Sequence, residues 1–291
     1  MPERPEWIRV RVPSPAEAEG IREMRELLAR HRLTTVCQGA ICPNAAECWA
    51  ARTATFMLLG GVCTRACRFC GVPTGDPGGA ADEDEPRRLA AAVDELGLRY
   101  VVLTSVDRDD LPDGGAGGFA AAVDRLKAEV PQARVEVLIP DFRGDRTALD
   151  RLLETGVDVV GHNVETVRRL TPALRDRRAG YEQSLAVLAR AHERAGLRKV
   201  KTGLMVGLGE TRDEIARTLA DLREVGVDIV TVGQYLRPTA AAVPVERYVP
   251  PSEFDDIAAE AEALGFSAVV AGPLVRSSYR AHRAFAESCA A

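Results

Sequence analysis

The strongest constraint on the fold is a repeat in which apolar runs alternate with amphipathic segments. Runs rich in β-branched residues occupy 55–63, 100–106, 135–140, 157–165, 200–209 and 229–236. Near-continuous apolar runs of this kind are typical of strands buried on both faces, as in parallel sheets. Segments with helical spacing lie at 85–97, 118–130, 147–156, 181–196, 210–226 and 253–265. Six successive strand–helix units require right-handed crossovers and helices that cover a parallel sheet.

This repeat predicts an α/β chain built as a (β/α)6 partial barrel. Glycine or polar residues recur where the strands end, and barrel sites assemble at that edge. A doubly wound open sheet would satisfy the same pattern and is the alternative. Several predicted helices end at a glycine suited to a C-cap, namely Gly97, Gly156, Gly196 and Gly226.

The chain is predicted to have three parts. An N-terminal extension covers 1–53 and holds one helix near 16–29, the barrel covers 54–265, and a C-terminal extension covers 266–291. The last part begins with a further apolar run at 266–275.

Composition excludes several classes of protein. Of the 291 residues, 46% are hydrophobic and 28% charged, which is ordinary for a globular chain and excludes a disordered one. The net charge of −5 gives no basic footprint, so neither nucleic acid nor a membrane is expected as a partner. No apolar run approaches the length of a transmembrane helix, and residues 1–15 lack the apolar core of a signal peptide. We therefore expect a cytoplasmic protein.

Six of the seven cysteines lie between Cys37 and Cys70. The cytoplasm keeps thiols reduced, so this clustering indicates metal or metal–sulfur ligation rather than disulfides. Cys63, Cys67 and Cys70 form CxxxCxxC where the first predicted strand ends. Three thiolates can hold a 4Fe-4S cluster and leave one iron open for a non-protein ligand. Structural zinc is the alternative, but it normally takes four protein ligands, and no fourth lies nearby.

A second cysteine trio lies upstream of the first. Cys37, Cys42 and Cys48 form CxxxxCxxxxxC, again one ligand short of four. The different spacing indicates two separate clusters. The seventh cysteine, Cys289, is expected to be a free thiol at a frayed C-terminus.

CxxxCxxC directly after the first strand of such a repeat resembles the radical S-adenosylmethionine (SAM) superfamily. The resemblance implies a partial TIM barrel of the radical SAM type. It also implies that the amino and carboxylate groups of SAM bind the open iron, and that electron transfer then yields a 5′-deoxyadenosyl radical. Phe69 matches the aromatic residue that flanks the adenine in that superfamily. An ordinary core aromatic is the alternative for Phe69.

A narrower resemblance, to the lipoyl synthase family, covers about residues 5 to 285. It rests on both trios, on RSSY at 276–279, and on the segments at 100–116, 139–144, 162–166, 201–211 and 233–239. The resemblance implies that Ser278 is the fourth ligand of an auxiliary 4Fe-4S cluster that supplies sulfur. For any Ser-Ser pair, a turn or helix N-cap is the alternative. This chain departs from the family at Gln38, Gly39, Ala40 and Ile41, where acidic residues are common.

Several polar residues are candidate SAM contacts. Gly114 and Gly115, within DGGAGG, could let backbone N–H groups approach an anionic ligand, although a plain left-handed turn fits equally well. Asn163 and Glu165 resemble the family's ribose and aminoacyl contacts, and a structural ion pair is the alternative for Glu165. Arg276 of RSSY is the first candidate among the basic residues for an anionic ligand. The other basic candidates are Arg65, Arg68, Lys201 and Arg237.

The resemblance implies insertion of two sulfur atoms at carbons 6 and 8 of a protein-bound octanoyl-lysine. Those C–H bonds carry no acidic proton, so a radical cofactor is needed. The implied partners are octanoylated carriers, namely the 2-oxoacid dehydrogenase E2 subunit and the H protein of glycine cleavage, and an electron donor such as flavodoxin or ferredoxin. Another radical SAM sulfur-insertion enzyme and a non-enzymatic iron–sulfur electron carrier are the alternatives.

Overall fold

The computed structural model describes residues 3–8, 14–36, 44–50 and 53–290. The chain forms two compact units. The first unit comprises Val10–Thr64 and Val72–Val159, and the second comprises Met1–Arg9, Arg65–Gly71 and Val160–Ala291. Each unit is described by itself.

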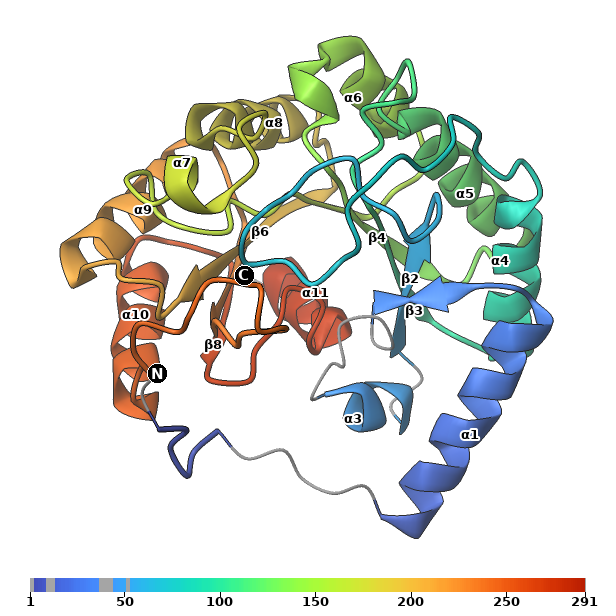
Figure 1. The fold of residues 1–291 in the computed structure, drawn as a ribbon. Coiled ribbons are helices and arrows are strands. Elements are labelled where there is room, and N and C mark those ends of the chain that lie inside the picture. Colours follow the sequence, from blue (N-terminus) through green and yellow to red (C-terminus); the bar gives the residue numbers. More distant parts are fainter. Residues whose placement is uncertain (1–2, 9–13, 37–43, 51–52, 291) are drawn as a thin grey trace. The chain divides into compact units, whose positions relative to one another are not determined.

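The first unit is a sheet with helices along it (Figure 1). Its strands follow the order β1 (Thr34–Thr35), β2 (Thr53–Leu58), β3 (Tyr100–Ser105) and β4 (Arg134–Leu138). β1 pairs antiparallel with β2, and the other pairs are parallel, with Phe56 opposite Leu103 and Leu103 opposite Val137. The helices are α1 (Pro15–Arg30), α3 (Ala45–Ala50), α4 (Glu85–Glu95), α5 (Ala116–Glu129), the 3-10 turn η1 (Phe142–Gly144) and α6 (Arg146–Leu153). Strands β2 and β3 are buried along almost their whole length, as expected for a sheet covered on both faces.

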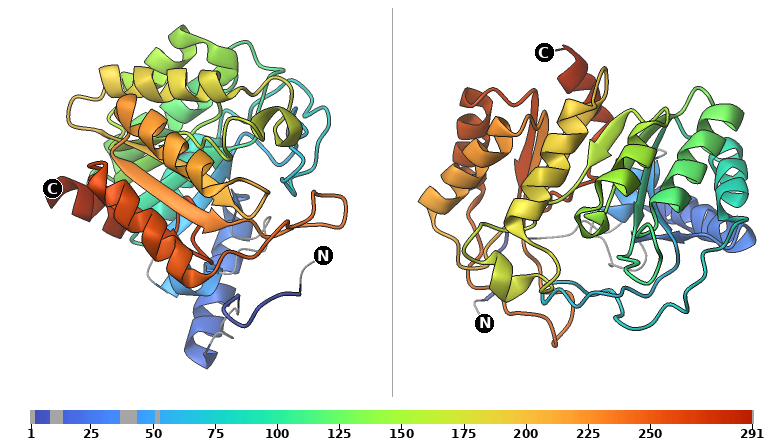
Figure 2. Two further views of the ribbon diagram at one scale, coloured as in Figure 1. Left: turned by 90° about the vertical axis from the view of Figure 1, so that its left-hand side faces the viewer. Right: turned by 90° about the horizontal axis from the view of Figure 1, so that it is seen from above.

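The second unit repeats this plan. Its strands are β5 (Val159–Gly161), which starts at the unit boundary, β6 (Lys199–Val206), β7 (Ile229–Gln234) and β8 (Ala268–Gly272). β6, β7 and β8 pair in parallel. The helices are α7 (Thr171–Leu174), α8 (Tyr181–Glu193), α9 (Arg212–Glu224), α10 (Pro251–Ala263) and α11 (Ala281–Ala290). Figure 2 shows α9 and α10 side by side along these strands. α9 begins with a capping box, in which Thr211 and Glu214 bond each other's backbone N–H groups.

The predicted strands and helices are confirmed, with ends that differ by up to five residues, and the apolar run at 266–275 contains β8. Among the described residues, five elements were not expected, namely the short strand β1, the short helices α3 and α7, the 3-10 turn η1 and the C-terminal helix α11. The three-part division at 1–53, 54–265 and 266–291 stays a prediction. Gly97, Gly196 and Gly226 adopt the left-handed conformation expected of C-caps. The same expectation for Gly156 is wrong, because α6 ends at Leu153 and Gly156 has no positive φ.

Cys289 is a free and exposed thiol, as expected. It lies in the last turn of α11, a helix that the sequence did not predict. In the part of the chain that the structure describes, no helix is long and apolar enough to cross a membrane.

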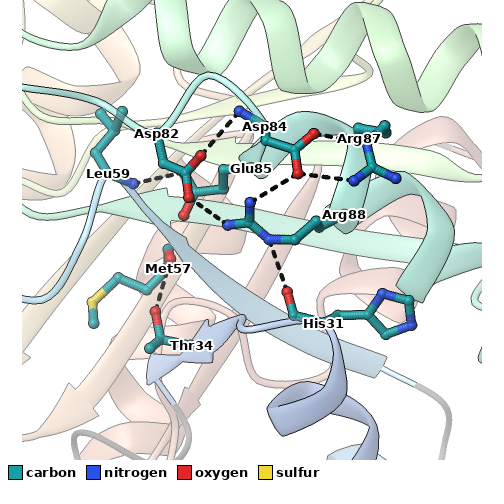
Figure 3. A network of polar contacts seen from close by, with 9 residues as sticks. All are labelled: His31, Thr34, Met57, Leu59, Asp82, Asp84, Glu85, Arg87 and Arg88. Carbon is teal, nitrogen blue, oxygen red and sulfur yellow. Dashed lines mark hydrogen bonds and ion pairs between the residues drawn. The ribbon is translucent and has the colours of Figure 1, made fainter.

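A polar network in the first unit joins the end of α1 to the start of α4 (Figure 3). The Arg88 side chain is only 9% exposed and donates to the carbonyl of His31 at 2.9 Å. It also donates to the carboxylates of Asp82 at 2.8 Å and Asp84 at 3.3 Å. Its neighbour Arg87 pairs with Asp84 in the open, where the two side chains are 61% and 43% exposed. Arg88 is therefore the buried centre of the network, and Arg87 lies at its rim.

Arg88→Met should destabilise the protein, whereas the matched control Arg87→Met should not. Losing Arg88 leaves the part-buried His31 carbonyl without this donor and takes one donor from each of two carboxylates, which costs about 1–3 kcal/mol in free energy of unfolding. An exposed pair such as Arg87–Asp84 contributes little to stability, because solvent screens the charges and both side chains lose freedom on pairing. The hydrogen bond from Arg87 helps lower the pKa of Asp84 from 3.8 to about 2. Stability from that carboxylate is therefore present above pH 3.8 and lost as the pH falls through about 2.

Denaturant unfolding at pH 7 would compare both variants with the wild type. Equal losses in the two variants would contradict the assignment of Arg88 as the buried centre.

Candidate functional site

Two of the CxxxCxxC cysteines, Cys67 and Cys70, belong to the second unit. Cys67 is half-buried and Cys70 is exposed, and both are thiols. The Cys70 N–H donates to the Cys67 carbonyl at 3.0 Å, which closes a tight turn between them. Arg68, between the two cysteines, uses both of its backbone groups: its N–H donates to the Leu174 carbonyl, and its carbonyl accepts from the Val243 N–H. The loop is thus held by backbone bonds to two other segments of the same unit.

The segment that follows α7 also contacts this loop. The Asp176 carboxylate accepts the Ala66 N–H at 3.0 Å, and the Asp176 N–H donates to the Cys67 Sγ at 3.3 Å. Arg178 bonds the same carboxylate through its backbone N–H and its guanidinium. The guanidinium hydrogen bond is the main cause that holds the pKa of Asp176 well below its usual range. Asp176 is therefore a charged anchor beside Cys67 of the CxxxCxxC motif.

Cys63 belongs to the first unit and lies in the segment that follows β2. Its N–H donates to Pro73, its carbonyl accepts from Gly75, and it forms a parallel bridge with Thr74. Its Sγ lies 3.8 Å from Oδ2 of Asp107, whose carbonyl accepts from both the N–H and the hydroxyl of Thr64. Cys63 is thus fixed at a defined position where the loop begins.

Asn163 and Glu165 follow β5 in the second unit, as predicted. The Thr202 hydroxyl donates to the His162 carbonyl and accepts from the Val164 N–H, so it fixes the backbone on both sides of Asn163. Glu165 adopts a left-handed φ of 69° while its N–H and carbonyl bond Gly203 and Met205 of β6. Strained backbone of this kind persists where the surrounding structure imposes it, commonly at functional sites.

The side chain of Asn163 carries an unused acceptor. Its Oδ1 is buried and has no hydrogen-bond partner among the described residues. A Cβ added to Gly203 would lie only 2.7 Å from this oxygen and 3.1 Å from the Thr231 hydroxyl. Because Gly203 has no side chain, the space beside the Asn163 Oδ1 stays open. A buried amide oxygen without a donor fits a ligand that brings a hydroxyl or ammonium group.

The glycine loop at 113–118 in the first unit has its N–H groups in use already. The Asp113 carboxylate accepts from Gly115 and Gly117 at 2.9 and 2.7 Å, and the Gly114 N–H donates to Leu111. Gly114 and Gly115 have positive φ, and a Cβ on Gly115 would lie 2.4 Å from Leu59. These contacts favour the left-handed turn that the sequence left open. The assignment of Gly114 and Gly115 to SAM stays a prediction.

Two other candidates, Phe69 and Arg276, make contacts within the second unit, the first by packing and the second by hydrogen bonds. Phe69 is half-buried and packs against the apolar cluster that includes Leu174 and Tyr235, as a core aromatic would. Arg276 donates to the carbonyls of Gln234, at the end of β7, and Val275. Of the other basic candidates, Arg65 and Lys201 are buried.

The upstream trio is described only in part. Cys37, Cys42 and the Gln38–Ile41 departure lie outside the described residues, whereas Cys48 is a half-buried thiol in α3 of the first unit. Ser278 lies in the second unit, in the turn before α11, where its carbonyl accepts from Ala281. The ligand set of an auxiliary cluster therefore stays a prediction.

Known proteins share both the motif and most of the sequence. The family model described as Radical SAM superfamily matches residues 57–222. Lipoyl synthase from Deinococcus radiodurans is 55% identical over 280 residues, which cover 96% of this chain and 84% of that protein. Lipoyl synthase from Pyrobaculum calidifontis is 56% identical over 287 residues, which cover 98% and 97%. The chain belongs to the lipoyl synthase family.

Membership of this family implies SAM and a 4Fe-4S cluster. Solved structures of low sequence identity show the fold. Methylornithine synthase matches with a TM-score of 0.52 at 16% identity, covering 77% of this chain and 66% of that one. SuiB of Streptococcus suis bound to SAM matches with a TM-score of 0.54 at 11% identity, covering 74% and 49%. The predicted fold class, an α/β partial barrel of the radical SAM type, is confirmed.

Sequence reasoning missed two residues beside the candidate site of this lipoyl synthase family member. Asp176 holds the CxxxCxxC loop through the Ala66 N–H and the Cys67 Sγ. Arg175 donates to the Ser184 hydroxyl at 2.7 Å and has a buried Nε with no partner among the described residues. The only signal was the charged run at 175–178 between two helical segments. Such a run is more often a solvated surface, so spacing alone could not single out either residue.

Proposed function

We propose that this chain is a lipoyl synthase that inserts two sulfur atoms, at carbons 6 and 8, into a protein-bound octanoyl-lysine. The observation that carries the proposal is a sequence identity above 50% to proteins named lipoyl synthase, over most of their length and nearly all of this chain. A match confined to the barrel would support only the superfamily, because CxxxCxxC alone specifies no more than that.

The radical-generating cluster is assigned to Cys63, Cys67 and Cys70. Bound there, the cluster would supply the electron that cleaves SAM and so provide a radical able to abstract hydrogen from an unactivated C–H bond. Asn163 would accept a hydrogen bond from a hydroxyl or amino group of SAM, which the unpartnered Oδ1 supports. Glu165, Phe69, Arg276, Gly114 and Gly115 complete the proposed cofactor contacts. Their role is to hold SAM in one orientation, so that the reactive carbon forms beside the substrate.

A second, auxiliary 4Fe-4S cluster is assigned to Cys37, Cys42, Cys48 and Ser278. It would supply both sulfur atoms, and two SAM molecules would be consumed for each product. Its basis is the second cysteine trio together with the RSSY motif.

Lipoyl synthases act on protein substrates. We propose octanoylated carrier proteins as substrates, either the 2-oxoacid dehydrogenase E2 subunit or the glycine cleavage H protein. Flavodoxin or ferredoxin would be the reductant, and the cytoplasm the compartment.

Anaerobic turnover with an octanoylated carrier domain tests the proposal. The reconstituted protein, SAM and a reductant should yield a lipoyl-carrier product, detected by mass, together with 5′-deoxyadenosine. SAM cleavage without lipoyl product would favour another radical SAM sulfur-insertion enzyme. No SAM cleavage at all would favour an electron carrier, and either result would reject the proposal.

Gly203→Ala should weaken SAM binding. The new Cβ would lie 2.7 Å from the Asn163 Oδ1, and such overpacking costs about 1–3 kcal/mol. If the cost falls on the bound state, the dissociation constant for SAM rises by about fivefold to a hundredfold. The measurement is SAM binding to the reconstituted protein by equilibrium dialysis.

Gly20→Ala is the matched control. A Cβ at Gly20 on α1 would meet nothing within 4 Å, so SAM affinity should be unchanged. Equal affinities for the wild type and the Gly203→Ala variant would remove Asn163 from the cofactor site.

A further inference from the structure

Asp176 contacts the CxxxCxxC loop in two ways, once through its side chain and once through its main chain. The side chain binds the loop backbone, because Oδ2 accepts the Ala66 N–H at 3.0 Å. The main chain binds the cysteine itself, because the Asp176 N–H donates to the Cys67 Sγ at 3.3 Å. All these residues belong to the second unit.

The position of the Asp176 N–H is set by its surroundings. Arg178 bonds the Asp176 carboxylate at 2.8 Å, and the Asp176 side chain is only 10% exposed. On the N-terminal side, the Leu174 carbonyl accepts the Arg68 N–H at 2.8 Å, and the Ala173 carbonyl accepts from the Arg68 side chain. The segment at 173–178 is therefore docked on the loop through several bonds on both sides of the N–H, and the N–H has little freedom to turn away.

A hydrogen bond to a cluster sulfur has a direct electronic consequence. Adding an electron to an iron–sulfur cluster increases negative charge on its sulfur ligands, and a donor N–H stabilises that charge. Hydrogen bonds to the sulfurs are accordingly one of the factors that set cluster reduction potentials. An N–H aimed at Cys67 would make the cluster easier to reduce.

We propose that Asp176 is a positioning residue for the radical-generating cluster: its carboxylate anchors the loop at Ala66, and its backbone N–H donates to the Cys67 thiolate and raises the cluster's reduction potential. This inference rests on the proposed function, since it requires the cluster on Cys63, Cys67 and Cys70. It goes beyond that function by assigning the control of cluster reduction to a residue outside the motif.

Two substitutions separate the two roles. Asp176→Ala removes the carboxylate and keeps the N–H, whereas Asp176→Pro removes both. Arg175 already has φ −88° and ψ 162°, the extended conformation that a residue before proline prefers. The difference between the two variants therefore reports the N–H alone.

The first measurement is the ratio of reduced to oxidised radical-generating cluster at a fixed solution potential, read by EPR without SAM or substrate. All proteins would carry Cys42→Ala, so that the auxiliary cluster does not contribute to the signal. We expect the ratio of reduced to oxidised cluster to be about fivefold lower in Asp176→Pro than in Asp176→Ala. A fivefold change corresponds to the net free energy of one hydrogen bond. Equal ratios, or a higher ratio in Asp176→Pro, would overturn the inference.

A second measurement needs no proline and stays decisive if Asp176→Pro fails to assemble its cluster. In the Cys42→Ala protein labelled with 15N-aspartate, pulsed EPR of the reduced cluster should detect a nitrogen coupling from Asp176. Asp176→Glu keeps the N–H and a carboxylate but removes the label, so it should lose that coupling. A bound cluster with no such difference would overturn this inference alone. A protein that binds no cluster at the CxxxCxxC loop would overturn the proposed function as well.

Discussion

Replacing Cys67 with alanine is expected to abolish SAM cleavage completely. The proposed radical-generating cluster would have only three protein ligands, so losing one would leave two thiolates to hold four irons. Cys67 is also the cysteine that receives the Asp176 N–H, so the same change removes a contact that orders the loop. The measurement is 5′-deoxyadenosine formed under reducing conditions, with the iron and sulfide content of each protein determined in parallel.

Two matched cysteine variants show whether this loss is specific. Cys42→Ala should keep much of the SAM cleavage, lose the lipoyl product and contain about one four-iron cluster fewer than the wild type. Cys289→Ala should change none of these, because Cys289 is an exposed thiol in α11 outside both trios. Lipoyl product from Cys42→Ala, or SAM cleavage by Cys67→Ala, would contradict the division of roles between the trios.

Ser278→Ala is expected to stop sulfur transfer while SAM cleavage continues. If Ser278 ligates the auxiliary cluster, its loss opens one iron and leaves the three thiolates of Cys37, Cys42 and Cys48 in place. The cluster should still assemble, with an altered Mössbauer signature, since one iron exchanges its ligand. The lipoyl product should fall to background, because the iron that must leave during sulfur transfer is no longer held by the serine.

Ser277→Ala is the control for that experiment. Both serines lie in the same turn before α11, so general damage to the turn should affect the two variants alike. A neighbouring hydroxyl that makes one ordinary hydrogen bond contributes on the order of 1 kcal/mol, and product formation should persist. If Ser277→Ala is the more harmful of the two, or if neither change matters, Ser278 is not the ligand.

The sequence predicted the main strands and helices because their hydrophobic period is long and regular. It did not predict the ten-residue helix α11, nor β1, α3 and α7, and the last three are only two, six and four residues long. Elements of that length have no period to detect, and their positions depend on tertiary contacts such as the Thr34 hydroxyl bond to the Met57 carbonyl. Gly156 shows the same limit, since a glycine after a helix need not be the residue that turns the chain.

Site residues could be proposed from the sequence where chemistry needs a particular residue type. Thiolates at fixed spacing single out Cys63, Cys67 and Cys70, and the polar pair after a strand singles out Asn163 and Glu165, and these assignments stay predictions. Asp176 could not be found this way, because part of its contact is made by a backbone N–H, which every residue except proline carries. Its location depends on how the segment after α7 returns to the loop, and no local pattern encodes that.

The left-handed backbone at Glu165 has a consequence for protein engineering. A side chain at φ 69° costs about 1–2 kcal/mol relative to glycine, so Glu165→Gly should relieve strain in the folded protein. Glycine also gains freedom in the unfolded chain, which offsets part of that relief. Where the strain relief is the larger effect, a selection that rewards heat resistance alone favours glycine and places no value on the carboxylate that is the proposed SAM contact. Variant libraries screened only for thermal stability should then accumulate Glu165→Gly proteins that bind SAM poorly, and screens of this family need an activity step as well.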